Sequence, residues 1–172
     1  RAVLLGIFLS FLGQFSGINA IIYYGPRILE EAGLSLSDAL GGQVIIGMVN
    51  VLFTLVAIWK IDQLGRRPLL LFGSIGIICS LMVIGFLFYF NVTGGIALMI
   101  FILIFIACFA FSFVPVVWVV ISEIYPTRIR GRAMAIATMA TWIGTALVGQ
   151  LVPVLLESAG PSGTFWLFAL FC

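Results

Sequence analysis

Amide side chains in an otherwise apolar stretch are the first residues of this sequence with chemistry of their own. Residues 2–26 carry no charge, yet they include Gln14 and Asn19. An amide both donates and accepts hydrogen bonds, so each of the two contacts either a polar ligand or a polar group of a neighbouring helix. Gly13 and Gly17 lie four residues apart around Gln14. This spacing favours either a broken helix or a close helix–helix contact, and it leaves both open.

Three other polar or helix-breaking features lie within long apolar runs. Asn50 is surrounded by valine, leucine and phenylalanine, so it is either a contact between helices or a ligand contact. Pro115 precedes Trp118 by three residues. A proline inside a helix removes a backbone hydrogen bond and bends the chain, which favours a hinge or a cavity there. Trp142 lies among threonines at near-helical spacing, a face more typical of helix packing than of ligand binding.

The residue types exclude most catalytic and metal-binding chemistry. The 172 residues include no histidine, so Ser-His catalysis and histidine-ligated metals are ruled out. The 3 cysteines lie far apart in apolar runs, which is typical of packing residues. We find no nucleophile–base pair, and a net charge of +2 without a basic cluster gives no basis for nucleic-acid binding. The sequence therefore predicts a protein that is not an enzyme and has no metal or cofactor.

The charged residues gather in short segments between the apolar runs. Two of these segments, Asp62-Gln-Leu-Gly-Arg-Arg67 and Ser122-Glu-Ile-Tyr-Pro-Thr-Arg-Ile-Arg-Gly-Arg132, combine an acidic residue with arginines and a glycine. Arginine pairs well with carboxylates. The segments are therefore expected either to hold helix ends together in one conformation or only to orient the chain by their positive charge.

The composition decides which elements can position these residues. Only 8% of the residues are charged and 63% are hydrophobic, whereas a soluble domain has about 25% charged and about 45–50% apolar residues. A bilayer core of about 30 Å needs roughly 20 apolar residues in a helix. The uncharged runs predict an all-α polytopic membrane helix bundle, with spans at residues 2–24, 39–60, 68–90, 96–121 and 132–156 and an incomplete sixth at 163–172. Because the sequence starts at Arg1 and ends inside an apolar run, we expect it to be part of a longer chain.

The charges also predict an orientation. One set of alternate span ends has a net charge of +5 and consists of Arg1, Lys60, Arg66, Arg67, Arg128, Arg130 and Arg132 with Asp62 and Glu123. The opposite ends have a net charge of −3 and hold Arg27, Glu30, Glu31, Asp38 and Glu157. Basic residues are enriched on the cytoplasmic side of membrane proteins, so the first set is predicted to be cytoplasmic.

Five motifs in one order give the sequence a family resemblance. They are Gln14-Phe-Ser-Gly-Ile-Asn19, Tyr23-Tyr24, Asp62-x-x-Gly-Arg-Arg67, Pro115-x-x-Trp118 with Ser122-Glu123-x-x-Pro126, and Arg130-Gly-Arg132. Across essentially the whole chain, these motifs resemble the sugar porter family of the major facilitator superfamily. The resemblance implies the C-terminal six-helix half of such a transporter, built as a 3+3 inverted repeat with its last helix cut short. It also implies an N-terminal six-helix half as partner.

The resemblance implies roles for individual residues. Sugar contacts are expected at Gln14, Asn19, Asn50, Trp118 and Trp142. Tyr23 and Tyr24 match residues that close the extracellular side, and helix hinges are expected at Gly17 and Pro115. A cytoplasmic gating network is expected from Asp62, Arg66, Arg67, Glu123 and Arg130.

The sequence departs from the family pattern at several of these places. Gly13 replaces a glutamine that contacts sugar, and Val114 replaces a glycine before the proline. Thr141 and Thr145 replace amides on either side of Trp142. A pentose, a hexose and a polyol therefore all stay open as substrates.

The predicted function is transport of a monosaccharide across the plasma membrane, or the bacterial inner membrane, by alternating access. Proton symport and facilitated diffusion stay open, because no acidic residue lies in the middle of a predicted span and the family's coupling carboxylate lies on the first helix of the other half. The alternatives are a sugar sensor of the same fold that does not transport and a drug exporter.

Overall fold

The computed structural model of the chain is helical almost throughout. It describes residues 2–31, 33–91 and 95–172, and the side chains of these residues apart from 2, 12, 62 and 64. The helices in the described part are α1 (Ala2–Gln14), α2 (Ile18–Glu31), α3 (Leu36–Leu64), α4 (Arg66–Tyr89), α5 (Gly95–Ile124), α6 (Arg130–Ser158) and α7 (Gly160–Phe171). The predicted all-α fold is confirmed.

Four helices are long and apolar enough to cross a bilayer on their own. They are α4, α5, α6 and the part of α3 that ends at Ile61, with 24 to 30 residues each. α1 and α2 have only 13 and 14 residues, fewer than the roughly 20 that a single span needs, but they follow one another across a short break. The predicted range 2–24 falls on these two helices together, and the range 163–172 falls on the 12-residue α7.

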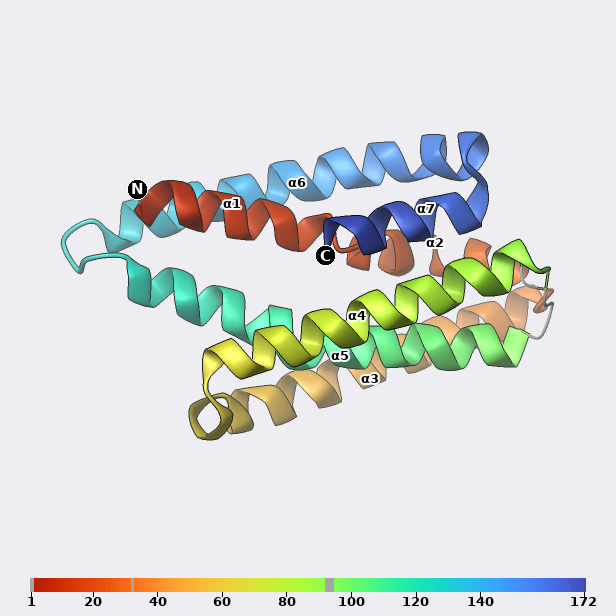
Figure 1. The fold of residues 1–172 in the computed structure, drawn as a ribbon, viewed down its shortest axis with the longest axis horizontal. Coiled ribbons are helices and arrows are strands. Elements are labelled where there is room, and N and C mark those ends of the chain that lie inside the picture. The colour runs from red at the N-terminus through yellow and green to blue at the C-terminus, as the bar shows by residue number, and fades with distance from the viewer. Residues whose placement is uncertain (1, 32, 92–94) are drawn as a thin grey trace.

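Part of the helix contacts fits two inverted three-helix units. α1–α2, α3 and α4 form the first unit, and α5, α6 and α7 form the second. Exchanging the units turns the α3–α5 contact into the α6–α1 contact and maps the α4–α7 contact onto itself, and all three are extensive pairings. The most extensive pairing, α4–α5, has no comparable counterpart between α7 and α1–α2 in the described part of the chain. Figure 1 shows the result, with α1, α6 and α7 on one side of the bundle and α3, α4 and α5 on the other.

Small residues allow α4 to approach its neighbours closely. A Cβ atom on Gly76 would lie 2.6 Å from Sγ of Cys108 in α5, and one on Gly73 would overlap the side chain of Ser112. In a membrane, helices associate mainly through van der Waals packing, and glycines allow the close contact that this packing requires. The contact fixes the position of α5, which carries Trp118.

Large apolar side chains cover much of the outer surface. Trp59 and Phe72, for example, are 72% and 75% exposed. An apolar surface of this extent is not stable in water and marks contact with lipid or with another protein. The composition, the long apolar helices and this surface together describe part of a multi-pass integral membrane protein.

The loops alternate between the two ends of the bundle. Figure 1 shows the α3–α4 turn and the α5–α6 segment at the same end as the N-terminus, and the α6–α7 connection at the opposite end. The two arginine-rich segments therefore lie at one end, as the charge pattern requires. That this end is cytoplasmic remains a prediction from the positive-inside rule.

Pro26 leaves one carbonyl of α2 without its helical partner, and α3 supplies a replacement. A proline has no N–H to donate to the carbonyl four residues earlier, here that of Ile22. Nε2 of Gln43 in α3 donates to this oxygen at 2.9 Å. The bond fastens α2 to α3 where α2 would otherwise expose an unpaired polar group to an apolar environment.

Candidate functional site

The chain breaks between α1 and α2 at the predicted Gly17. Its φ of +87° is one that other residues rarely adopt. A Cβ atom there would also lie 3.1 Å from the ring of Phe168 in α7. Ser16 in the break donates its hydroxyl to the carbonyl of Gly13 at 2.8 Å, which satisfies one exposed helix-end carbonyl. The broken helix and the close glycine contact, two alternatives in the sequence, therefore occur together.

Three polar side chains meet at this break and form a polar cluster of Gln14, Asn19 and Thr145. Nδ2 of Asn19, in the first turn of α2, donates to Oε1 of Gln14 at 2.8 Å. The hydroxyl of Thr145 in α6 has one hydrogen, which it shares between the same oxygen at 3.1 Å and the Thr141 carbonyl at 3.0 Å. Asn19 is only 8% exposed. The break thus turns two residues five apart in sequence toward each other and places them against α6.

A cavity of about 110 Å³ lies beside the polar cluster. Its lining comes from α1, α5 and α6 and consists of Ser10, Gly13, Gln14, Phe109, Phe113, Val114, Val117, Trp118 and Thr141. Gln14 belongs to both the cluster and the cavity. Trp118 is 41% exposed, so part of its indole is uncovered by this chain. Pro115 lies buried within α5 one turn before it. The cavity combines hydrogen-bonding groups with aromatic faces.

Two predicted ligand contacts lie elsewhere in the described structure. Asn50 lies half buried on α3, and its backbone carbonyl accepts a hydrogen bond from the hydroxyl of Thr54 at 2.7 Å. Trp142 lies on α6 and is 67% exposed. Neither residue lines the cavity beside Gln14. Their roles stay predictions.

The two tyrosines of α2 have different environments. Tyr23 is 54% exposed, whereas Tyr24 is half buried and its hydroxyl donates to the carbonyl of Gly149 at 3.1 Å. This carbonyl lies four residues before Pro153, so the proline leaves it without a helical partner. Tyr24 therefore fastens α2 to α6, in the same way that Gln43 fastens it to α3.

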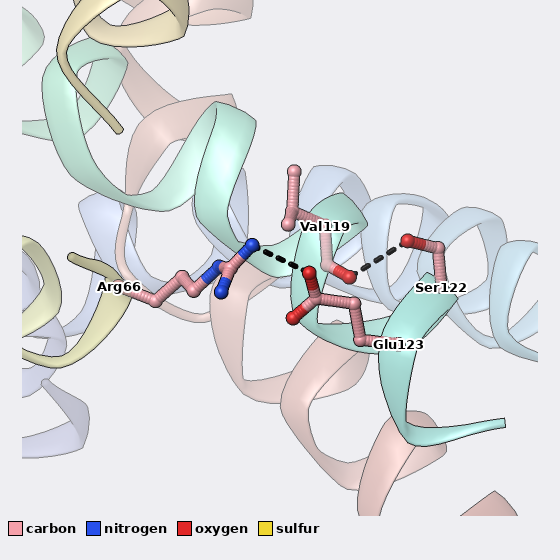
Figure 2. A network of polar contacts seen from close by, with 4 residues as sticks. All are labelled: Arg66, Val119, Ser122 and Glu123. Carbon is pink, nitrogen blue, oxygen red and sulfur yellow. Dashed lines mark hydrogen bonds and ion pairs between the residues drawn. The ribbon is translucent and has the colours of Figure 1, made fainter. Parts of the chain in front are cut away.

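One ion pair joins α4 and α5 at the arginine-rich end. Nη2 of Arg66 lies 2.5 Å from Oε1 of Glu123, and the two side chains are 44% and 49% exposed. Figure 2 shows the guanidinium reaching from the start of α4 to the end of α5, where the hydroxyl of Ser122 turns back to the Val119 carbonyl. Hence the two charged segments do meet, through one residue of each.

The other residues of the predicted gating network are not part of this ion pair. Arg67 and Arg130 are exposed at the same end. The side chain of Asp62 lies outside the described residues. The ion pairs among described side chains are Arg66–Glu123 and, within α2, Arg27–Glu31 at 3.4 Å.

Sequence reasoning did not find Ser10. The residue is one of those that line the cavity, and it is only 2% exposed. Its buried hydroxyl has no hydrogen-bond partner among the described groups. An unpaired buried hydroxyl is unfavourable unless a ligand or water completes it. The available signal was its position four residues before Gln14, which places both on one helix face.

Another group that the sequence did not reveal is the phenol of Tyr125, just after α5. The residue is 1% exposed, and its hydroxyl has no partner among the described groups. It packs on Gly6 of α1, where a Cβ atom would overlap the phenol. Burial raises the pKa of Tyr125 above its ordinary value.

Comparison with known proteins identifies relatives along the whole chain. The family model described as "Sugar (and other) transporter" matches residues 1–172. The chain is 40% identical over 170 residues to the arabinose-proton symporter of Bacillus subtilis, covering 99% of this chain and 37% of that protein. It is 38% identical over 163 residues to the glucose facilitated diffusion protein of Zymomonas mobilis, covering 95% and 34%.

A solved structure agrees with the fold. The proton:xylose symporter XylE of the major facilitator superfamily, bound to 6-bromo-6-deoxy-D-glucose, matches with a TM-score of 0.87 and 34% identity. The match covers 98% of this chain and 37% of that one. The chain thus spans little more than a third of the length of the relatives it matches.

Proposed function

Because this chain belongs to the sugar transporter family of the major facilitator superfamily, we propose that it forms one wall of a monosaccharide site in a carrier that works by alternating access. The observation that carries the proposal is the polar cluster at a broken helix, with Gln14 reaching the cavity that Trp118 lines. Carriers commonly bind substrate at interrupted helices.

The chemistry of this wall suits a polyhydroxylated ring. Each sugar hydroxyl both donates and accepts hydrogen bonds, so it can pair with either the donor or the acceptor group of an amide such as that of Gln14 or Asn19. The rings of Trp118 and Phe113 provide apolar surface for the C–H groups of the sugar. The buried hydroxyl of Ser10 offers a further hydrogen bond in place of the glutamine that Gly13 lacks.

The other wall is proposed to be the N-terminal six-helix half. Trp118 and Trp142 remain 41% and 67% exposed, and large aromatic surfaces at a carrier's site are expected to be covered by substrate or by the partner half. In this arrangement Asn50 and Trp142 contact the sugar only when the halves close on it. The Arg66–Glu123 pair and Tyr24 then stabilise the closed state at opposite ends.

The proposal is tested by uptake in cells that lack their own sugar carriers, expressing the complete protein that contains this chain. We expect uptake of labelled xylose, arabinose, glucose or galactose, reduced about tenfold or more by Trp118→Ala, which removes an aromatic face of the cavity, and by Asn19→Ala, which removes the hydrogen bond that orients Gln14. Ser158→Ala, on an exposed part of α6, is the matched control and keeps wild-type uptake.

The result also separates the competing functions. Sugar binding by purified protein without uptake favours a sensor, and uptake or export that no sugar inhibits favours a drug exporter. A protonophore that abolishes accumulation identifies symport, whereas equilibration that is insensitive to it identifies facilitated diffusion. If the protein bound no sugar and both variants behaved as the wild type, the proposal would be wrong.

A further inference from the structure

Two side chains donate to the carbonyl oxygen of Gln14. An amide oxygen has two lone pairs. Nδ2 of Asn19 donates to Oε1 at 2.8 Å, and Oγ1 of Thr145 lies 3.1 Å from it. These two bonds fix the rotation of the amide plane about the side chain. Nε2 of Gln14, with two N–H groups, has no hydrogen-bond partner among the described residues.

The α6 backbone also positions Gln14. Gly144 packs on its side chain, since a Cβ atom there would lie 3.1 Å from Cγ of Gln14. Thr145, the next residue, donates a three-centre hydrogen bond, because its single hydroxyl hydrogen is shared between Oε1 of Gln14 and the Thr141 carbonyl at 3.0 Å. α6 thus receives the stem of Gln14 at one residue and its amide oxygen at the next.

We propose that Thr145 is a positioning residue that makes Gln14 act as a hydrogen-bond donor toward the substrate. The inference rests on the proposed function and adds a specificity to it. With Oε1 occupied by Asn19 and Thr145, the group left for the cavity is the NH₂ of Gln14. The sugar oxygen that Gln14 contacts must therefore accept a hydrogen bond. The contact does not require that this oxygen also carry a hydrogen.

Sugar analogues distinguish a donating amide from an accepting one. Replacing a hydroxyl by fluorine keeps a weak acceptor but removes the donor, whereas replacing it by hydrogen removes both. We expect one ring position at which the fluoro analogue binds about three- to tenfold more tightly than the deoxy analogue, the size of one hydrogen bond. If Gln14 instead presented its oxygen, both analogues would lose affinity equally at that position.

The experiment measures binding of a complete deoxy and deoxyfluoro panel of the transported sugar to the full carrier. Thr145→Val removes the hydroxyl with little change in shape, and Thr145→Ser restores it. Thr138→Val is the matched control, because it lies two helical turns earlier and its hydroxyl bonds only to the Met134 carbonyl. We expect the fluoro–deoxy difference to disappear in the valine variant and to persist in the serine and control variants.

A second measurement without sugar examines the contact itself. A double-mutant cycle between Thr145→Val and Gln14→Met, followed by denaturant unfolding, reports their coupling. A coupling near zero overturns the inference, and so does a fluoro–deoxy pattern that the valine variant retains. If the wild type binds no sugar, the proposed function fails, and a coupling within the cycle still supports the Thr145–Gln14 contact.

Discussion

Removing one charge from the Arg66–Glu123 pair should shift the carrier away from the state in which its arginine-rich end is closed. The pair joins α4 to α5 at 2.5 Å, but both side chains are nearly half exposed. Ion pairs of this exposure are worth about 0.2–1 kcal/mol in double-mutant cycles. If the pair is lost when this end opens, that free energy corresponds to a change of about 1.4- to fivefold in the ratio of closed to open states.

The perturbation is Glu123→Gln, which keeps the size and an acceptor oxygen but loses the charge. Arg66→Gln and the double variant complete a cycle that isolates the pair. The assay is single-molecule energy transfer between dyes on the two halves at this end of the full carrier. Since the pair is solvent-exposed, raising the salt to about 1 M, where the Debye length is about 3 Å, should remove most of the coupling.

The Arg27–Glu31 pair provides a matched control. It is also exposed, but both partners lie on α2, so it joins no two helices. Glu31→Gln should leave the closed fraction unchanged. A coupling of zero for Arg66–Glu123, or one that 1 M salt does not reduce, would refute the reasoning. A coupling above tenfold would show instead that the partner half buries the pair, contrary to the exposure found here.

Three further substitutions have defined outcomes. Ser10→Ala removes a buried, unpaired hydroxyl, so it should raise the free energy of unfolding by about 1 kcal/mol while weakening sugar binding. Thermal unfolding with and without sugar measures both effects. A parallel loss of stability and affinity would argue against Ser10 facing the substrate. Gly17→Ala forces a side chain into a left-handed conformation against Phe168 and should destabilise the protein by about 1–3 kcal/mol in the same assay, whereas an unchanged midpoint would mean that the break can relax. Because burial raises the pKa of Tyr125, folding stability should be constant below the ordinary tyrosine pKa near 10 and should fall above it as the unfolded state ionises first. Tyr125→Phe should lack this part of the alkaline loss, and identical pH profiles of the two proteins between about pH 8 and 11 would contradict that origin.

Much of the fold follows from hydropathy, because long apolar helices have few alternatives in a bilayer. The predicted ranges 39–60, 68–90, 96–121 and 132–156 each fall on one helix. The first range does not, since α1 ends at Gln14 and α2 starts at Ile18, directly after Gly17 with its positive φ. Sequence indicated that break only as one of two alternatives, because the same glycine also provides close packing.

The candidate site was predictable in its residue types but not in its pairings. Gln14, Asn19 and Trp118 stand out as polar or aromatic groups in apolar runs. That Thr145 reaches Gln14, 131 residues away, depends on how α6 packs against α1, which no local pattern encodes. Ser10 escaped notice because serine is common in membrane helices and usually bonds its own backbone, as Ser112 does here.

Pro153 leaves the Gly149 carbonyl without its helical partner, so the effect of substitutions at Tyr24 and Pro153 depends on the order in which they occur. While Pro153 is present, losing the hydroxyl of Tyr24 leaves that oxygen unpaired in an apolar setting. If Pro153 changes first, the new N–H closes the helix internally and the tyrosine hydroxyl is no longer needed there. Tyr24 and Pro153 therefore form an epistatic pair: the proline can be lost before the tyrosine at little cost, but the reverse path crosses an unstable intermediate.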